Sequence, residues 1–503
     1  MKLAFQNKNN SQDTDAVVKK DSVMKRIVRS FVSFAKGAWQ NRTVLVSQAA
    51  ASVISVVIVV SFFSLYRNDL LTVTPASLSA DQQESLDSVC REKFPSSIIS
   101  ALPYEHEQPE LDLSAESAIL IDSANGCILY EKNADEMIPP ASMTKLVAMF
   151  VVEQEIATGR ISYDDVVPLL EDCWAINQPW DSSLMYLAEG QRVTLDELLQ
   201  GLSVMSGNDA AYALADYTSG SMDAFLERMN NEVASLGLTN THFVEPSGYS
   251  ELNMTTARDF VQFSRVYIER YPDSLEKYHS LRSFTYPKEE NLPEDLTPAQ
   301  IARGSGSWYI PYSPRTKSNT NPLLDLLEGC DGLKTGYIDE SGYNLALTAK
   351  RNGTRFLSIT MRGQGENSRE GNEFRIKDGT ELMEYAFGNY TTVQPEKADD
   401  IPVIVSCGLD GELFLVQAQN PALTVPHIHG LTADTPQDEI ELTRTVDVPS
   451  YVCAPVHAGD FLGTVTYSYM GTVLETVPLV ADRDIEKADD IKCLLDRIVL
   501  RKL

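Results

Sequence analysis

The sequence predicts an α+β domain, a small β-sandwich domain and one N-terminal transmembrane helix. Residues 115–390 show strand patterns, then a block of helical patterns, then strands again, which is the order typical of α+β folds. Residues 400–482 alternate apolar and polar positions between Gly turns, which predicts short strands without a helix. Residues 44–66 carry no charge and are long enough to cross a bilayer. A chain of 503 residues has room for all three parts.

The charge distribution predicts which side of a membrane each part occupies. Residues 1–42 hold nine Lys or Arg and three Asp, whereas the whole chain carries a net charge of −29. Because basic flanks stay in the cytoplasm, the arm over 1–43 is expected inside and the acidic body outside. For 44–66 the alternatives are a buried core helix and a signal peptide, but its apolar region is longer than such signals have. The acidic body excludes nucleic acid as an expected partner, since it would repel phosphate.

The elements of the body follow from local patterns. Residues 67–114 are predicted to be an extracytoplasmic stalk, because four prolines interrupt them. Two strand patterns, over 117–122 and 127–131, flank Asn125-Gly126, which predicts a hairpin with a type I′ turn. A helix is expected from Ser142, where apolar residues recur at helical spacing. Further helices are expected over 195–205, 209–217, 222–236 and 256–271. The later strands are expected over 343–349 and 356–361, and in the β domain over 401–406, 412–416, 440–448, 461–469 and 473–479.

The C-terminal segment 486–503 is predicted to form a helix with one apolar stripe, which comprises Ile491, Leu494, Leu495, Ile498 and Val499. We expect this stripe to dock on the β domain rather than touch the membrane, because three Asp residues accompany it.

The seven cysteines are widely spaced, without the C-x-x-C or Cys/His clusters of metal sites. We therefore expect no metal and no cofactor. An exported body permits disulfides, but the spacing leaves their pairing open, and buried thiols are the default expectation.

Three short motifs hold the residues that could do chemistry: Ser142-Met143-Thr144-Lys145, Ser206-Gly207-Asn208 and Lys334-Thr335-Gly336. Each is weak alone. Ser-x-x-Lys also occurs elsewhere, as at Ser33–Lys36 and Ser274–Lys277, and Ser142 in isolation fits a helix N-cap equally well. The second motif fits an ordinary helix cap, and the third fits a hairpin turn with an exposed Lys.

Their context favours nucleophilic catalysis. Lys145 lies one helical turn after Ser142, on the same face and within reach of its hydroxyl. Apolar neighbours would lower the pKa of Lys145, and a neutral amine could then take the Ser142 proton without a histidine. Ser206 could relay a proton to a leaving amine, and Asn208 could hold Lys145 or a substrate amide. On the expected strand, Lys334 supplies charge for a carboxylate, Thr335 a donor, and Gly336 room for a substrate backbone.

The three motifs in this order resemble those of active-site serine penicillin-recognising enzymes. The text "IDSANGCILYEKNADEMIPPASMTK", with "SGNDAAYALADYTSGSMDAFLERMNNEVASLGLTNTHF" and "NTNPLLDLLEGCDGLKTGYIDESGYNLALTAK", resembles the low-molecular-weight D-alanyl-D-alanine carboxypeptidases, peptidase family S11, over residues 115–390. The segment "VCAPVHAGDFLGTV" resembles the family's C-terminal domain more weakly. This resemblance implies a penicillin-recognising serine transpeptidase-like fold.

The resemblance also implies roles for individual residues. Ser142 would be the acylated nucleophile and Lys145 its proton acceptor, and the backbone N–H groups of Ser142 and Tyr337 would form the oxyanion hole. Arg369, in "RGQGENSRE", would help bind the terminal carboxylate, together with the Lys334 motif. The substrate would be a peptidoglycan stem peptide ending in D-Ala-D-Ala, β-lactams would acylate Ser142, and the protein would lie in a bacterial cell membrane.

Three alternatives remain at this stage. A serine β-lactamase needs a deacylating base, for which Glu245 is the nearest candidate. A catalytically inactive wall-binding or scaffolding protein is disfavoured by the presence of both Ser142 and Lys145. An endopeptidase acting on cross-bridges is not distinguished from a carboxypeptidase. The chain departs from the family in "EPSGY" over 245–249, where "HGL" text is more usual, and in its N-terminal rather than C-terminal tether.

Overall fold

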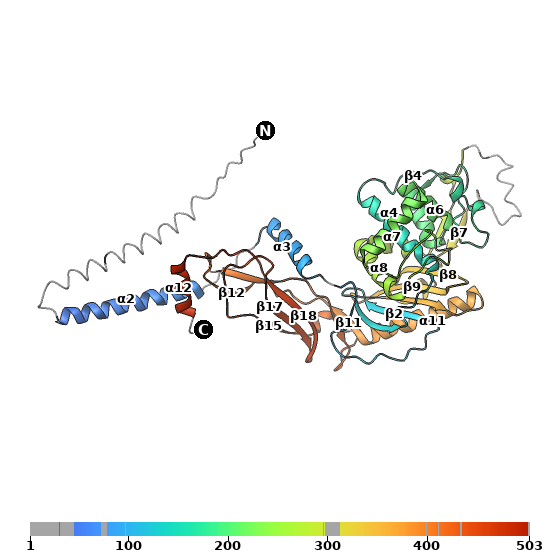
Figure 1. Ribbon diagram of the computed structural model, residues 1–503. Helices are drawn as coiled ribbons and strands as arrows, with labels where there is room; N and C mark the ends of the chain where they lie inside the picture. The colour runs from blue at the N-terminus through green and yellow to red at the C-terminus, as the bar shows by residue number, and fades with distance from the viewer. Residues whose placement is uncertain are drawn as a thin grey trace, which may run out of the picture.

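The computed structural model describes residues 30, 45–71, 78–95, 97–294, 296, 312–398, 400–410, 412–432 and 435–500. Figure 1 shows an elongated molecule, with helix α2 at one end, the β domain in the middle and the α+β domain at the other end. Except for Ser30, the expected basic arm over 1–43 lies outside the described residues.

Helix α2 (Leu45–Leu71) continues beyond the expected end of the apolar segment at residue 66. Within the described part of the chain, it is the helix whose length and composition suit a membrane span. Its window Ala51–Asn68 has a mean hydropathy of 1.6 and none of it is buried.

The α+β domain is built on a six-stranded sheet whose order is β1-β3-β2-β10-β9-β8. The strands are β1 (Ser100–Ala101), β2 (Ser117–Asp122), β3 (Cys127–Lys132), β8 (Cys330–Ile338), β9 (Gly342–Arg351) and β10 (Thr354–Gly363). Neighbours are antiparallel, apart from the short parallel pair β1–β3. Strand β8, which carries the third motif, is therefore an edge strand of this sheet.

Two of the hairpins of the sheet, β9–β10 and β2–β3, turn differently. Between β9 and β10, Asn352 and Gly353 both have positive φ, 47° and 84°, as a type I′ turn requires. The type I′ turn expected at Asn125-Gly126 is wrong, because only Gly126 has positive φ there. The loop is longer, and side chains shape it: Asp122 accepts from Ala124 N–H, and Asn125 from Cys127 N–H.

Helices cover both faces of the sheet. One face carries the helical block: α4 (Thr144–Ala157), α5 (Leu195–Gln200), α6 (Asn208–Ser219), α7 (Met222–Ser235) and α8 (Ala257–Arg270). The other carries α11 (Ser368–Asn389) along β9 and β10. Strand β2 serves both cores, since Ile119 and Ile121 join the block while Ala118 and Leu120 join the α11 side. The smaller elements of this domain are β4 (Val166–Val167), β5 (Val193–Thr194), β6 (Ser283–Tyr286), β7 (Arg315–Ser318) and α10 (Leu323–Leu326), with 3-10 turns at Ala141–Met143, Glu171–Cys173, Ala175–Asn177 and Glu289–Asn291 and π-helical turns at Gly201–Met205 and Leu275–His279.

Helices α3 (Ala80–Lys93) and α11, like the short α10, had no counterpart in the sequence-based expectations. Helix α11 begins at the N-cap Asn367, whose side chain accepts from two backbone N–H groups. Helix α3 begins with a capping box of Ser79 and Gln82, inside the segment expected as a stalk. Its buried residues Leu86 and Cys90 pack against Val480 of the β domain. In both cases the capping residues can be recognised in the sequence. The helices were not predicted because apolar residues recur only weakly at helical spacing.

The β domain packs a six-stranded sheet against a two-stranded one around a single apolar core. The large sheet has the order β15-β17-β18-β13-β12-β16. Its strands are β12 (Ile401–Ser406), β13 (Glu412–Gln417), β15 (Thr443–Asp447), β16 (Tyr451–Cys453), β17 (Phe461–Tyr469) and β18 (Thr472–Ala481); β11 (Tyr390–Val393) and β14 (Leu423–Pro426) form the small one, and a 3-10 turn lies at Gln437–Glu439.

A buried carboxylate joins the two domains. Asp122, at the end of β2, accepts hydrogen bonds from Thr392 Oγ1 at 2.7 Å and from Thr424 Oγ1 at 2.8 Å. Thr392 lies on β11 and Thr424 on β14, so the β2–β3 hairpin of the α+β domain is hydrogen-bonded directly to the small sheet of the β domain. Asn125 adds bonds to Ala422 O and Thr424 Oγ1.

The C-terminal helix α12 (Asp490–Leu500) docks on the β domain, but not through its apolar stripe. Ile491, Leu494 and Ile498 are exposed, whereas the buried residues are Cys493, Asp496 and Leu500. The expected face was wrong because Asp496 has partners to satisfy it in the interior. Its carboxylate accepts from Cys407 N–H and from Tyr66 Oη of α2.

Candidate active site

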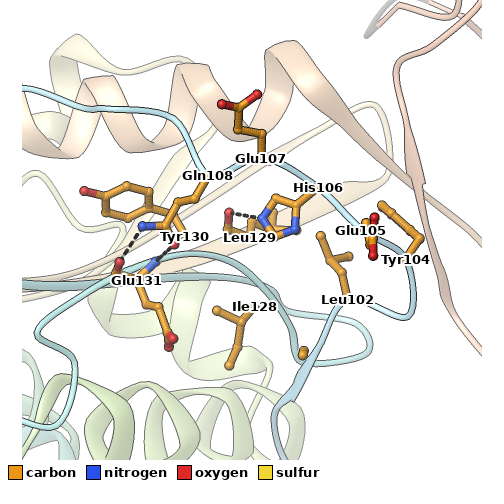
Figure 2. Close-up of a pocket in the computed structure, with 11 residues that line it drawn as sticks. Leu102, Tyr104, Glu105, His106, Glu107, Gln108, Ile128, Leu129, Tyr130 and Glu131 are labelled. Atoms are coloured by element: carbon orange, nitrogen blue, oxygen red, sulfur yellow. Dashed lines mark hydrogen bonds between the residues drawn. The ribbon is translucent and has the colours of Figure 1, made fainter.

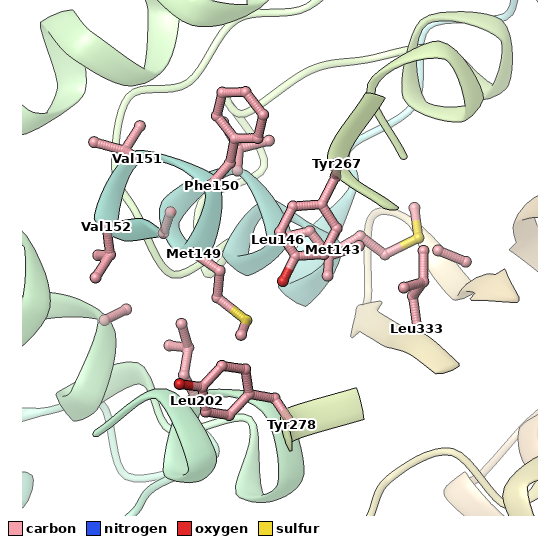
Figure 3. Close-up of a cluster of buried hydrophobic side chains, with 14 of the residues drawn as sticks. Met143, Leu146, Met149, Phe150, Val151, Val152, Leu202, Tyr267, Tyr278 and Leu333 are labelled. Carbon is pink, nitrogen blue, oxygen red and sulfur yellow. The ribbon is translucent and has the colours of Figure 1, made fainter. Parts of the chain in front are cut away.

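Helix α4 is packed on all sides, which makes it a rigid base for the first motif. Residues 146–152 are fully buried, and α4 contributes them to the core of the helical block. Figure 3 shows Met149 of this helix directed toward Leu202 and Tyr278. Because the helix has no solvent face here, a lysine within it is also taken out of water.

Ser142 and Lys145 are in contact. Lys145 Nζ lies 2.9 Å from Ser142 Oγ. Ser142 lies in the 3-10 turn that leads into α4, and its side chain does not cap that turn. The preceding Ala141 has a φ of 49°, a strained conformation for a residue with a Cβ.

Lys145 has two further partners, both carbonyl oxygens. Its Nζ donates to Asn208 Oδ1 at 2.8 Å and to the backbone carbonyl of Ser247. The Lys145 side chain is 0% exposed. This burial lowers the pKa of Lys145 to about 7, although the carboxylates of Glu245 and Asp209 act in the opposite direction.

The second motif is held by a buried carboxylate beside it. Ser206 has a φ of 58° and ends the π-helical turn, and Asn208 begins α6. Asp209, which is fully buried, accepts from the N–H groups of 185–187 at 2.7 to 2.9 Å. Asn208 N–H donates to Ser183 O at 2.8 Å. The loop 183–187 is thus bonded to the motif, and burial raises the pKa of Asp209.

The loop 245–250 supplies the Ser247 carbonyl, and Glu245 organises it. The carboxylate of Glu245 accepts from Ser247 N–H at 2.8 Å, Gly248 N–H at 2.6 Å and Asn253 Nδ2 at 2.9 Å. Gly248 packs so closely that a Cβ there would lie 1.9 Å from Ala141 O. The text "EPSGY" therefore forms a wall of the site, in direct contact with the turn that carries Ser142.

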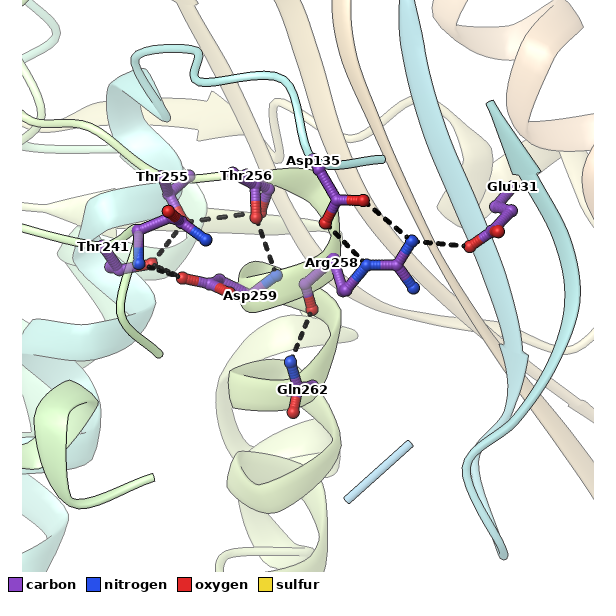
Figure 4. Close-up of polar contacts among 9 residues, drawn as sticks. Glu131, Asp135, Thr241, Thr255, Thr256, Arg258, Asp259 and Gln262 are labelled. Atoms are coloured by element: carbon purple, nitrogen blue, oxygen red, sulfur yellow. Dashed lines mark hydrogen bonds and ion pairs between the residues drawn. The ribbon is translucent and has the colours of Figure 1, made fainter. Parts of the chain in front are cut away.

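The chain segments on either side of this loop, at Thr241 and Thr255, are held together at the start of α8 (Figure 4). Asp259 accepts from Thr241 Oγ1 at 2.9 Å, and Thr241 Oγ1 lies 2.8 Å from Thr255 Oγ1. Next to them, Arg258 bonds Asp135 at 2.7 Å and Glu131 of β3 at 2.8 Å. The helical block, the loop and the sheet are thereby joined by charged groups at one point.

The third motif lies next to the first. A Cβ on Gly336 would lie 2.6 Å from Pro140 O and 3.2 Å from Ser142 N, so only glycine allows this approach. Lys334 is 1% exposed, and its Nζ donates to Thr335 O at 3.0 Å. Burial, together with the charges of Lys145 and Arg375, lowers the pKa of Lys334 well below its usual value. Thr335 Oγ1 donates to Thr320 Oγ1 at 2.8 Å.

The cationic group that touches the third motif from α11 is Arg375. Its guanidinium donates to Gly336 O and, at 3.2 Å, to Asn344 O. Arg369, which the sequence analysis selected, lies one to two turns earlier with a side chain 88% exposed and 3.5 Å from Glu373. Sequence reasoning did not select Arg375, and the signal available for it was its place on a helix that was itself not predicted.

Of the selected residues, Ser142, Lys145 and Asn208 are joined by direct contacts, and the Lys334 motif borders them through Gly336. Tyr337 follows with a half-exposed ring, 4.4 Å from the ring of Tyr343 between centroids.

A groove of about 630 Å³ lies elsewhere, between the segment 101–108 and strand β3 (Figure 2). His106 Nε2 lies 3.3 Å from Leu129 O, and Gln108 bonds the backbone of Glu131. None of the selected site residues lines it. The groove is the seam where this segment runs along the edge of β3.

Known proteins share this arrangement. Residues 104–365 match the family model described as D-alanyl-D-alanine carboxypeptidase, and 431–487 match that described as penicillin-binding protein 5, C-terminal domain. The chain belongs to the D-alanyl-D-alanine carboxypeptidase family S11. It is 29% identical to DacF of Bacillus subtilis (76% of this chain, 89% of that protein) and 30% identical to DacA of Escherichia coli K12 (78% and 88%).

Solved structures agree with this assignment. The chain matches penicillin binding protein 5 from Haemophilus influenzae at 26% identity with a TM-score of 0.63, covering 76% of this chain and 100% of that one. It matches penicillin binding protein 6B from Escherichia coli at 28% and 0.56, covering 76% and 99%. The family and fold class predicted from the sequence are thus confirmed, and the chain is a D-Ala-D-Ala carboxypeptidase hydrolase.

Proposed function

We propose that this carboxypeptidase removes the terminal D-alanine of peptidoglycan stem peptides through an acyl-enzyme on Ser142, with Lys145 as the general base. Ser142 Oγ attacks the carbonyl carbon of the penultimate D-alanine, and the bond to the terminal D-alanine nitrogen breaks. Water then attacks the ester and releases the shortened peptide. Cross-linking would fall, because trimmed stems lack the terminal bond that transpeptidases use.

The observation that carries the proposal is the set of three contacts of Lys145 Nζ. Two partners, Asn208 Oδ1 and Ser247 O, are acceptors only, so each takes one N–H of the amine. In a neutral amine the third position is a lone pair, and it faces Ser142 Oγ at 2.9 Å. With its pKa lowered to about 7, Lys145 is neutral in a large fraction of molecules near neutral pH. The arrangement suits removal of the Ser142 proton.

The edge strand β8 supports a substrate-binding role for the third motif. A stem peptide could add to this edge as an extended strand, with its terminal carboxylate toward Lys334 and Thr335. Gly336 keeps the edge beside Ser142, where the N–H groups of Ser142 and Tyr337 would hold the oxyanion. Ser206 would pass a proton to the leaving amine. Arg369 would reach the carboxylate only after leaving Glu373, whereas Arg375 holds the strand itself.

The contacts of Glu245 disfavour the β-lactamase alternative. A deacylating base needs a free carboxylate oxygen to activate water. Both oxygens of Glu245 already accept N–H groups of its own loop, Oε2 from Ser247 and Oε1 from Gly248. We therefore expect β-lactams to acylate Ser142 and to be released slowly.

Location follows from α2 and the charge pattern. We propose that α2 crosses the bacterial membrane once, with the basic arm in the cytoplasm and both folded domains outside. The stem peptide is exposed on that side.

Trapping with a penicillin tests this proposal. The full chain in detergent is incubated with benzylpenicillin, its intact mass is measured over time, and it is digested with trypsin. The expected adduct resides on the peptide Asn133–Lys145, which contains Ser142, and persists for minutes or longer. An adduct on another peptide contradicts the assignment of Ser142, and its loss within seconds favours a β-lactamase. Release of D-alanine from diacetyl-Lys-D-Ala-D-Ala separates a carboxypeptidase from a pure endopeptidase.

A further inference from the structure

Two of the seven cysteines meet where α12 docks on the β domain. Cys407 directly follows β12, Cys493 lies in α12, and both are buried. Two hydrogen bonds of the Cys407 backbone hold the chain on either side of Cys493 against it: Ala488 N–H donates to Cys407 O at 2.7 Å, and Cys407 N–H donates to Asp496 Oδ2 at 2.7 Å. The chain before α12 and the middle of α12 are therefore both bonded to Cys407.

Helix geometry turns Cys493 toward Cys407. Asp496 follows Cys493 by three residues, so the two side chains share one face of α12. Since Asp496 is bonded to the backbone of Cys407, the Cys493 thiol faces the same residue. The Cys407 thiol is near enough to Cys493 to raise the pKa of its thiol.

Each of the two sulfur atoms makes a long polar contact with a neighbouring oxygen atom. Ser406 Oγ lies 3.7 Å from Cys407 Sγ, and Ala488 O lies 3.8 Å from Cys493 Sγ. Across the described part of the chain, no group of three or more His, Cys, Asp or Glu is arranged to hold a metal ion. Two adjacent buried thiols without a metal partner are suited to bonding with each other.

We propose that Cys407 and Cys493 form a disulfide that fastens the C-terminal helix to the β domain. This inference rests on the proposed location outside the cytoplasm, where disulfides persist. An external disulfide, from a small molecule or a thiol oxidoreductase, is attacked by one thiolate, and the resulting mixed disulfide is attacked by the other. One S–S bond forms in the protein, and the oxidant leaves as two thiols carrying the two electrons and two protons.

The bond would also secure the end of the membrane helix. The second oxygen of Asp496 accepts from Tyr66 Oη of α2 at 2.5 Å. Holding α12 in place therefore keeps α2 attached to the β domain. The covalent loop from 407 to 493 encloses five of the six strands of the large sheet.

Peptide mapping under non-reducing conditions tests the proposal. The full chain is expressed with its body exported, free thiols are alkylated with iodoacetamide in denaturant, and trypsin is added. The two cysteines fall in different peptides, Ala398–Arg444 and Cys493–Arg497, while Cys453 falls in a third, Thr445–Arg483. We expect the first two to be linked, with five alkylated thiols before reduction and seven after it. Seven alkylated thiols without reduction would overturn the proposal.

Two variants test whether the linked cysteines are identified correctly. Cys493→Ser should abolish the linked peptide, whereas Cys453→Ser, which removes an exposed thiol on β16, should keep it. A link from Cys407 to Cys453 instead contradicts the proposal. If reduced wild-type protein forms no linked peptide in oxidised glutathione, the proposal also fails. D-Alanine release is measured on the same samples. Because it depends on Ser142, inactivity would refute the proposed function while leaving the mapping result readable.

Discussion

The catalytic cleft and the β domain use their interiors in opposite ways. The cleft buries Lys145, Lys334 and Asp209 and holds Ala141 and Ser206 at positive φ, all of which costs free energy of folding. The core of the β domain is an apolar cluster drawn from alternating strand positions. The difference teaches that the proposed active site keeps costly buried charges and strained backbone, whereas the β domain contributes apolar packing. Substitutions in the two regions should therefore separate activity from stability.

The largest expected effect on activity comes from Ser142→Ala. Under the proposed mechanism this variant lacks the nucleophile, so kcat for D-alanine release should fall by about 10³-fold or more, as it does when a serine hydrolase loses its covalent nucleophile. The thermal midpoint should change little, since one partly exposed oxygen is lost. Steady-state kinetics and calorimetry check both halves. Release at the wild-type rate would refute covalent catalysis by Ser142.

Gly248→Ala should have the next largest effect and lower kcat/KM about 10²-fold. Its added Cβ would lie 1.9 Å from Ala141 O and would displace the turn beside Ser142, and a misplacement of 1 Å is enough for such a loss. Gly388→Ala is the matched control, because nothing lies within 4 Å of its added Cβ on α11. The same assay, run on both variants, should show an effect at residue 248 alone.

Leu479→Ala tests the role of packing in the β domain. Leu479 is fully buried in β18, and truncation should cost the β domain about 2–5 kcal/mol of stability. We expect kcat/KM to stay within about twofold of wild type at temperatures where the domain remains folded. Denaturant unfolding followed alongside D-alanine release measures both. A loss of activity before unfolding would mean that the cleft depends on the β domain.

The smallest effect is a shift in pH dependence. Because Lys145 acts as a base only when neutral, kcat/KM should rise with pH through an apparent pKa near 7. The charge of Glu245 raises the pKa of Lys145, so Glu245→Gln should move this limb to lower pH. The carboxylate of Asp209 also raises the pKa of Lys145. The control Glu384→Gln removes a carboxylate of α11 that pairs with Arg351 at the end of β9, and its pH profile should match that of the wild type.

The sequence was most informative where neighbours along the chain are also neighbours in space. Ser142 and Lys145 are one helical turn apart, so their contact could be predicted, as could the Lys334 motif on a strand. The Ser247 carbonyl lies about a hundred residues from Lys145, and no local pattern links them. Arg375 was missed because its helix has little apolar periodicity. The orientation of α12 was predicted wrongly because a carboxylate with buried partners overrode the apolar stripe.

The bonds of Asp122 have a consequence at the scale of the cell envelope. This carboxylate joins the β2–β3 hairpin of the α+β domain to the two-stranded sheet of the β domain. It thereby restrains the angle between the two domains. Under the proposed topology, the cleft then stands at a constant height above the bilayer. Such an enzyme would trim stems within one layer of the wall, so the thickness of the molecule, as much as its chemistry, would decide which peptides it meets.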